Sequence, residues 1–150
     1  MSRRAQPASS GADAKPSLDR VFYDGHCGLC HCSVRFLLDR DRDGSRFRFA
    51  PLDSDAFRLR VGEDRRAALP DSLVVLTADG RLLTRSAAAL HALRRLGGFW
   101  GGLGGVAAMV PRPLRDLVYD LIAKARRHLF RAPDEACPYM PPELRRRFEL

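Results

Sequence analysis

The 150-residue sequence lacks an apolar segment near its start, and the one glycine-rich apolar segment further along is short. Residues 1–17 are rich in Ser, Ala, Gly, Pro and basic residues, without the apolar core of a secretory signal. Residues 97–110 are apolar but too short to span a bilayer. We therefore expect a soluble, cytoplasmic protein with no membrane span and a disordered tail over residues 1–17.

Acidic residues are also in short supply, since 18 Asp and Glu face 26 Lys and Arg, a formal net charge of +8. A nucleic-acid-binding protein gathers its basic residues on one surface. Here they are scattered and interleaved with acids, as in residues 39–43, and only residues 145–147 form a run of three. The pattern indicates a charged, solvated surface, and we expect no specific nucleic-acid partner.

The chain has four cysteines, of which Cys27, Cys30 and Cys32 lie within six positions. Disulfides between residues this close restrain little of the unfolded chain, so no structural disulfide framework is expected. The C-x-x-C spacing of Cys27 and Cys30 places both sulfurs on one face of a helix's first turn. A helix N-terminus favours the reactive thiolate. The crowding therefore indicates chemistry at this pair.

Apolar periodicity predicts the element order β-α-β-α-β-β-α before residue 97. The strands are expected at residues 19–23, 46–50, 72–77 and 81–84, and the helices at residues 27–39, 53–69 and 86–96. Asp79-Gly80 supplies the hairpin turn, Ser86 is expected to cap the third helix, and Gly97-Gly98 to end it. The order predicts an α/β protein with a thioredoxin-like fold, a four-stranded mixed sheet flanked by helices.

Spacing also predicts which helix faces are buried. The expected stripes are Cys30, Val34, Leu37 and Leu38 in the first helix and Ala89, Leu90, Leu93 and Leu96 in the third. Cys32 faces away from the first stripe.

The chain divides into a tail, a core and an extension. Residues 18–97 are expected to form the thioredoxin-like core, and residues 98–150 a C-terminal helical extension of the same domain. Within the extension, residues 97–110 form either a flexible loop or a short helix over the domain. Residues 113–130 show a helical apolar stripe, and residues 143–148 a short helical turn.

Several motifs together resemble a known family. They are Y-D-G-x-C-x-L-C at residues 23–30, S-V-R-F-L at 33–37, D-S-L-V at 71–74, S-A at 86–87, P-x-P-L-R-D-x-V-Y at 111–119, Cys137, and P-E-L at 142–144. The sequence resembles the DCC family (DUF393) of predicted thiol-disulfide oxidoreductases over roughly residues 18–148. The resemblance implies a thioredoxin-like fold and a redox role, with a disulfide- or thiol-containing protein or small molecule as substrate.

Within the motif we predict distinct roles for the two thiols. Cys27, at or just outside the helix start, is expected to be exposed and to be the nucleophile, while Cys30, on the buried stripe, resolves the mixed disulfide. Asp24 either caps the helix by accepting the N–H of Cys27 or passes protons to and from the thiols. Gly25 is expected to adopt a backbone conformation that other residues resist.

Substrate contacts are expected from Tyr23, Gly25 and His26 beside the dithiol and from Asp71 and Ser72 before the third strand. Thioredoxins place a cis-proline before that strand. Pro70 is only a candidate for it, and Asp71-Ser72 in that position implies a different docking of substrate.

The histidines divide by context. His26 and His31 flank the pair, and a protonated histidine next to Cys27 stabilises a thiolate. His91 and His128 have no such context and are expected at the surface.

Two alternatives use the same cysteines. A zinc module would combine Cys27 and Cys30 with Cys32, Cys137 or a flanking histidine, but structural zinc sites usually need two spaced pairs. Residues 27–31 also match the C-x-x-C-H haem attachment motif, which requires export. The leading hypothesis is an oxidoreductase with no bound cofactor or metal. Cys137 is left open as a third redox thiol, a ligand or a packing residue.

Overall fold

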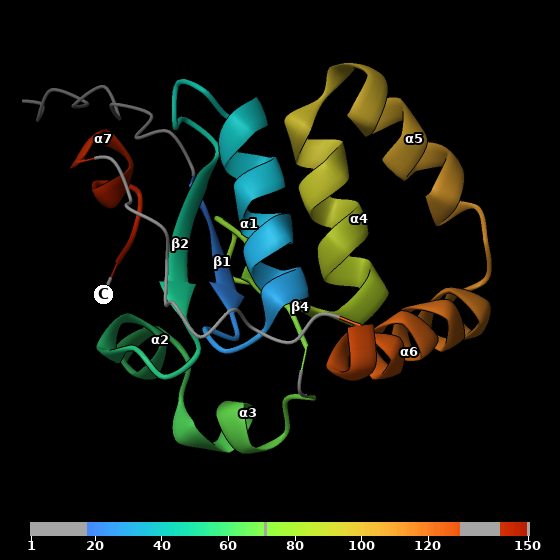
Figure 1. Ribbon diagram of the computed structural model, residues 1–150, viewed down its shortest axis with the longest axis horizontal. Helices are drawn as coiled ribbons and strands as arrows, with labels where there is room; N and C mark the ends of the chain where they lie inside the picture. The colour runs from blue at the N-terminus through green and yellow to red at the C-terminus, as the bar shows by residue number, and fades with distance from the viewer. Residues whose placement is uncertain (1–17, 71, 130–141, 150) are drawn as a thin grey trace, which may run out of the picture.

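The computed structural model of the chain describes residues 18–70, 72–129 and 142–149. Its four strands are β1 (Asp19–Tyr23), β2 (Phe47–Pro51), β3 (Val74–Leu76) and β4 (Leu82–Thr84). They form one sheet in the order β2-β1-β3-β4, in which β1 runs parallel to β2 and antiparallel to β3, and β3 antiparallel to β4. This mixed sheet, flanked by helices, is consistent with the predicted thioredoxin-like fold (Figure 1).

Alternation along β1 divides the core into two layers. Val21 and Tyr23 point to the side covered by α1 (Gly28–Arg40) and α4 (Arg85–Leu96), where they join a cluster that contains Cys27 and Cys30. Phe22 points to the other side and packs against Phe57 of α2 (Asp55–Arg60). The helix expected at residues 53–69 is two short helices, α2 and α3 (Glu63–Ala67). The buried Val61 ends α2 in an extended conformation, and the exposed Gly62 precedes α3.

The start of α4 differs from the prediction. The helix begins at Arg85 after Thr84, and Ser86 does not cap it, because its hydroxyl donates a hydrogen bond to the Asp116 carboxylate of α6 (Arg112–Leu129).

The buried face of α4 differs as well. The residues that face the sheet core are Ala88, Ala92 and Leu96, whereas Ala89, Leu90 and Leu93 are half-buried. The difference comes from residues distant in the sequence, because the flank of α4 that carries Ala89 and Leu93 borders the C-terminal extension instead of the sheet.

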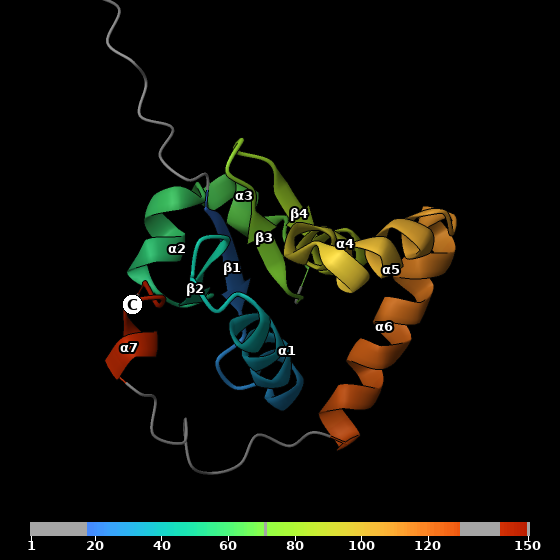
Figure 2. The same cartoon turned by 90° about the horizontal axis from the view of Figure 1, so that it is seen from above.

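The extension begins without a loop. Gly97, with a φ of +71°, ends α4, and α5 (Gly98–Ala108) follows directly, so the helical alternative for this segment is confirmed. A Cβ on Gly104 would lie 3.0 Å from the Arg94 side chain, so glycine permits the close packing of α5 on α4. Figure 2 shows α5 and α6 as an arm at the side of the molecule away from α2. No helix in the described ranges is long and apolar enough to cross a membrane.

Residues near the C-terminus add to the sheet, which the sequence did not predict. After α7 (Pro142–Arg145), Phe148 pairs in parallel with Phe49 of β2. The Phe49 N–H donates to the Arg147 carbonyl at 2.8 Å, and the Glu149 N–H to the Phe49 carbonyl at 2.8 Å. We call residues 146–149 the C-terminal strap. The strap covers the outer edge of β2 at Phe49.

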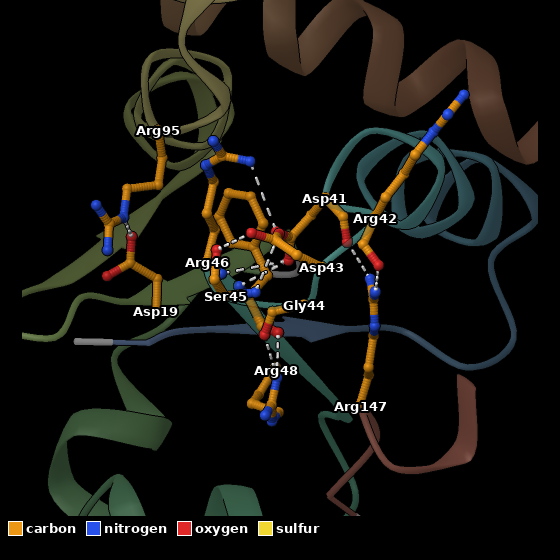
Figure 3. A network of polar contacts seen from close by, with 11 residues as sticks. Asp19, Asp41, Arg42, Asp43, Gly44, Ser45, Arg46, Arg48, Arg95 and Arg147 are labelled. Atoms are coloured by element: carbon orange, nitrogen blue, oxygen red, sulfur yellow. Dashed lines mark hydrogen bonds and ion pairs between the residues drawn. The ribbon is translucent and has the colours of Figure 1, made fainter. Parts of the chain in front are cut away.

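A polar network around the buried Asp41 fastens the strap to the end of α1 (Figure 3). Asp41 accepts the Phe47 N–H at 3.1 Å, and its pKa is raised, chiefly because burial disfavours the carboxylate. The Arg147 guanidinium donates to the carbonyl oxygens of Asp41 and Arg42. Arg147, in the basic run assigned to a solvated surface, therefore has a structural role.

A second carboxylate, Asp19, ties α4 to the sheet. It is buried and accepts the Ala78 N–H at 2.9 Å, and it lies 2.8 Å from His91 Nε2 and 3.3 Å from Arg95 Nε. The prediction of His91 as a plain surface residue is wrong.

Candidate active site

Cys27 occupies the N-cap position of α1 and is itself the capping residue. Its backbone is extended (φ −103°, ψ 112°), and its Sγ accepts a hydrogen bond from the Cys30 N–H at 3.3 Å. Helix N-caps are usually Ser, Thr, Asp or Asn, whose oxygens satisfy one of the free N–H groups of the first turn. Here a sulfur takes that place, so α1 directs an N–H at the predicted nucleophile.

Asp24 supports the turn before Cys27 rather than the helix. Its Oδ1 accepts the His26 N–H at 2.9 Å, an Asx turn, and its carbonyl oxygen accepts the Cys27 N–H at 3.2 Å. The prediction that the Asp24 carboxylate caps the helix is therefore wrong. The prediction for Gly25 is also wrong, since this exposed residue does not have a positive φ and a Cβ on it would meet no atom within 4 Å.

His31 fixes this turn against the helix. Its Nε2 lies 2.7 Å from the Gly25 carbonyl oxygen, and because a carbonyl only accepts, Nε2 is the donor. The His31 ring meets the Tyr23 ring edge to face at 5.6 Å, and Tyr23 in turn meets Phe148 at 6.3 Å. Tyr23 is thus a core residue, and its role in substrate binding stays a prediction. His26 is exposed at the turn.

Both thiols of the pair are shielded from solvent. Cys27 is 9% exposed and Cys30 is 5% exposed, whereas Cys32 is exposed, and none of the three is in a disulfide. The inward position of Cys30 and the outward position of Cys32 confirm the predicted helix face. The expectation that Cys27 is exposed is wrong, because the thiol turns inward and joins the core cluster beside Cys30.

A small apolar pocket of about 80 Å³ borders Cys30. Its lining comes from three helices and from the residue just before β3: Leu29, Cys30, Ser33, Leu73, Ala89, Tyr119, Ile122 and Ala123. The sequence did not predict that α6 lines this pocket. The one signal for it in the sequence was Tyr119, the last residue of the motif at residues 111–119.

The segment before β3 meets the site through Leu73, which was not among the predicted residues. The Leu73 N–H donates to the Tyr119 hydroxyl at 3.2 Å, and its side chain borders the pocket. Ser72 is buried, and Asp71 lies outside the described residues. Pro70 lines a different hollow of about 440 Å³ with Arg85 and Arg112, and no cis peptide bond occurs in the described ranges.

Comparison with known proteins decides the relationship. Residues 21–132 match the family described as DCC1-like thiol-disulfide oxidoreductase. The chain belongs to this family. The uncharacterized protein YuxK of Bacillus subtilis (strain 168) is 36% identical over 132 residues, which cover 85% of this chain and 91% of that protein.

A plant protein is also similar to this DCC1-like chain. The DCC family protein At1g52590 of Arabidopsis thaliana, named as chloroplastic, is 31% identical over 110 residues, which cover 73% of this chain and 63% of that protein. No solved structure matches the chain significantly. The DCC1-like family supports a redox function in general terms and thiol-containing substrates, and its match extends through α6.

The zinc alternative requires further ligands near the dithiol. Within residues 18–70, 72–129 and 142–149, no three His, Cys, Asp or Glu side chains are grouped so that they could hold a metal ion. Cys137, which that alternative could recruit, lies outside these ranges.

Proposed function

We propose that this DCC1-like protein catalyses thiol-disulfide exchange, with Cys27 as the nucleophile and Cys30 as the resolving thiol. The observation that carries the proposal is the hydrogen bond from the Cys30 N–H to Cys27 Sγ at the start of a 13-residue helix. A thiolate accepts such a bond more strongly than a thiol, and the helix N-terminus adds positive potential. Both effects suit a sulfur that must carry negative charge before it attacks.

The exchange proceeds in two displacements. In the reducing direction, the Cys27 thiolate attacks one sulfur of a substrate disulfide, a mixed disulfide forms, and the first substrate thiolate leaves. The Cys30 thiolate then attacks Cys27 Sγ, so a Cys27–Cys30 disulfide forms and the second substrate thiolate leaves. The substrate disulfide gains two electrons and the protein dithiol loses them. The reverse sequence oxidises a substrate dithiol.

Asp24 is proposed to accept the proton that Cys30 loses before its attack. It is the one acidic residue between positions 20 and 38, and its carbonyl oxygen already holds the Cys27 N–H. The exposed turn residues Gly25 and His26 are the proposed contact with the disulfide- or thiol-containing substrate. Asp71 and Ser72, which precede β3 in the sequence, are proposed as further contacts.

Trapping the mixed disulfide tests the roles of the two thiols. Cys27→Ser and Cys30→Ser are compared in a background that carries Cys32→Ser and Cys137→Ser, with glutathione disulfide as the probe and intact mass as the readout. The Cys30→Ser variant should accumulate glutathione on Cys27, while the Cys27→Ser variant reacts at least about tenfold more slowly. Equal rates would contradict the assignment, and stoichiometric zinc that survives chelation would favour the metal alternative.

The proton-transfer role of Asp24 has a matched pair of variants. Asp24→Asn keeps an oxygen that can accept the His26 N–H but removes the base, whereas Asp24→Ala removes both. If Asp24 transfers protons, both variants should slow release of the second thiol by about a hundredfold. If it only supports the turn, Asp24→Asn should behave as the wild type.

A further inference from the structure

Helix α6 turns its apolar side away from the domain. Five large apolar residues of this helix are 50–67% exposed: Leu114, Leu117, Val118, Leu121 and Ile122. Their spacing of three, one, three and one residues places them on a single stripe. An amphipathic helix in a globular protein normally buries such a stripe, so this one requires another explanation.

The opposite side of α6 makes the contacts to the domain, and it is polar or small. Asp116 accepts a hydrogen bond from Ser86, and Asp120 pairs with Arg85 at 3.5 Å. The Tyr119 hydroxyl accepts the Leu73 N–H, and Ala123 borders the pocket beside Cys30. These specific contacts hold α6 in its orientation, so the outward stripe is a built feature of the fold.

Helix α5 and the turn after it, in the same arm, also expose large apolar side chains. Phe99, Val106 and Met109 are 77%, 66% and 83% exposed, and Leu103 is 45% exposed. Figures 1 and 2 both place α5 and α6 at the side of the molecule away from α2 and α7. We call these residues of α5, the following turn and α6 the apolar arm surface. Exposed apolar patches of this kind mark interaction sites.

Charge indicates what covers the apolar arm surface. No residue of α5 is charged, and α6 has five basic residues against two acids. Both acids, Asp116 and Asp120, lie on the domain side, where they are bonded. At 100° per residue, Lys124 and Arg115 lie on the two flanks of the apolar stripe. Apolar residues flanked by basic ones fit the acyl and phosphate layers of an anionic bilayer.

The same charges disfavour a second copy of the chain as the occupant. Two α6 helices packed stripe to stripe would bring the basic flanks of one copy against those of the other. The acids that could balance them lie on the far side of each helix. Like charges at such a contact oppose association.

We propose that the apolar arm surface binds peripherally to anionic lipid bilayers, with α6 lying in the plane of the membrane. The exposed Lys124 extends to the phosphates while the leucines enter the acyl boundary. Ile122 belongs to the stripe and also borders the pocket at Cys30, so a bound membrane lies close to the dithiol. The proposal does not depend on the redox role of that dithiol.

Vesicle co-sedimentation with the full chain tests the proposal. The probes are vesicles of phosphatidylcholine with one third phosphatidylglycerol, and vesicles of phosphatidylcholine alone. Binding is expected to the anionic vesicles and should fall steeply in 0.5 M salt. Leu117→Glu with Leu121→Glu should weaken binding at least about a hundredfold, and Lys124→Glu roughly thirtyfold. The matched control is Leu59→Glu, since Leu59 of α2 is 87% exposed on the other side of the molecule and should bind as the wild type.

Circular dichroism first checks that each variant is folded, which is expected because every substituted residue is on an exposed surface. Three outcomes of the binding and sedimentation experiments would contradict the proposal. Absence of binding to anionic vesicles would refute the proposal. Equal binding to neutral vesicles would refute the role of charge. A dimer in sedimentation velocity that Leu117→Glu dissociates would identify a second copy as the occupant.

Discussion

Helices α1 and α6 are both amphipathic, yet α1 packs its apolar side against the domain and α6 packs its polar side. Helix α1 places Cys30, Val34 and Leu37 against the sheet, and all three are at most 5% exposed. Helix α6 holds Asp116 and Tyr119 against the domain and leaves its leucines in solvent. The crossover from β1 to parallel β2 carries α1 across the sheet face, whereas α6 arrives where α1 and α4 already cover that face. Periodicity therefore predicts that an apolar face exists but not what it contacts.

The largest expected effect comes from one substitution made in both helices. Val34→Asp would place a carboxylate at a site 4% exposed and should destabilise the protein by at least about 4 kcal/mol, or prevent folding. Val118→Asp, at a site 50% exposed, should change the free energy of unfolding by at most about 0.5 kcal/mol. Urea unfolding followed by circular dichroism measures both. A large loss in Val118→Asp would show that the stripe of α6 is buried in the isolated protein.

The polar docking of α6 should show a smaller effect. Ser86→Ala removes the hydroxyl that bonds to the Asp116 carboxylate and should cost about 1.5–3 kcal/mol, the range for a hydrogen bond to a charged group. Ser33→Ala is the matched control, because the Ser33 hydroxyl bonds only to a carbonyl of its own helix, at 2.9 Å. If Ser86→Ala costs no more than Ser33→Ala, the polar contact does not hold α6.

The smallest effect concerns the end of α1, where Asp41 is buried. Its pKa is raised above 3.8 in the folded state, chiefly because burial disfavours the carboxylate, so the folded protein binds a proton that the unfolded chain has lost. The stability from this group is present below pH 3.8 and is lost as the pH rises through the raised pKa. From pH 3.5 to pH 7, the wild type should lose stability relative to Asp41→Asn, in which position 41 does not titrate. A constant difference would contradict the raised pKa.

The sequence predicted the elements whose signals are local. Asp79-Gly80 gave the hairpin between β3 and β4, and the stripe of Cys30, Val34 and Leu37 gave the inner face of α1. The same stripe predicted that Cys30 is buried and that Cys32 is not. These features depend on residues only a few positions apart, so the sequence alone is enough to predict them.

The parts that the sequence did not predict depend on distant contacts or unusual chemistry. A sulfur as the N-cap of α1 departs from the usual capping residues, so the sequence offered the Asp24 carboxylate as the candidate cap. The face that α4 buries differs from the predicted one because α5 and α6 pack against its flank, and the pocket beside Cys30 also needs α6. The Tyr119 hydroxyl meets Leu73 across 46 positions, which no local pattern reveals.

The C-terminal strap also occupies backbone hydrogen-bonding groups at the edge of the sheet. An uncovered edge strand offers unpaired N–H and C=O groups to any extended chain, and this is how sheets recruit neighbours into aggregates. At β2 the backbone groups of Phe49 are already bonded, to Arg147 and Glu149. Losing the Arg147 guanidinium contacts would therefore free the β2 edge as a template for aggregation.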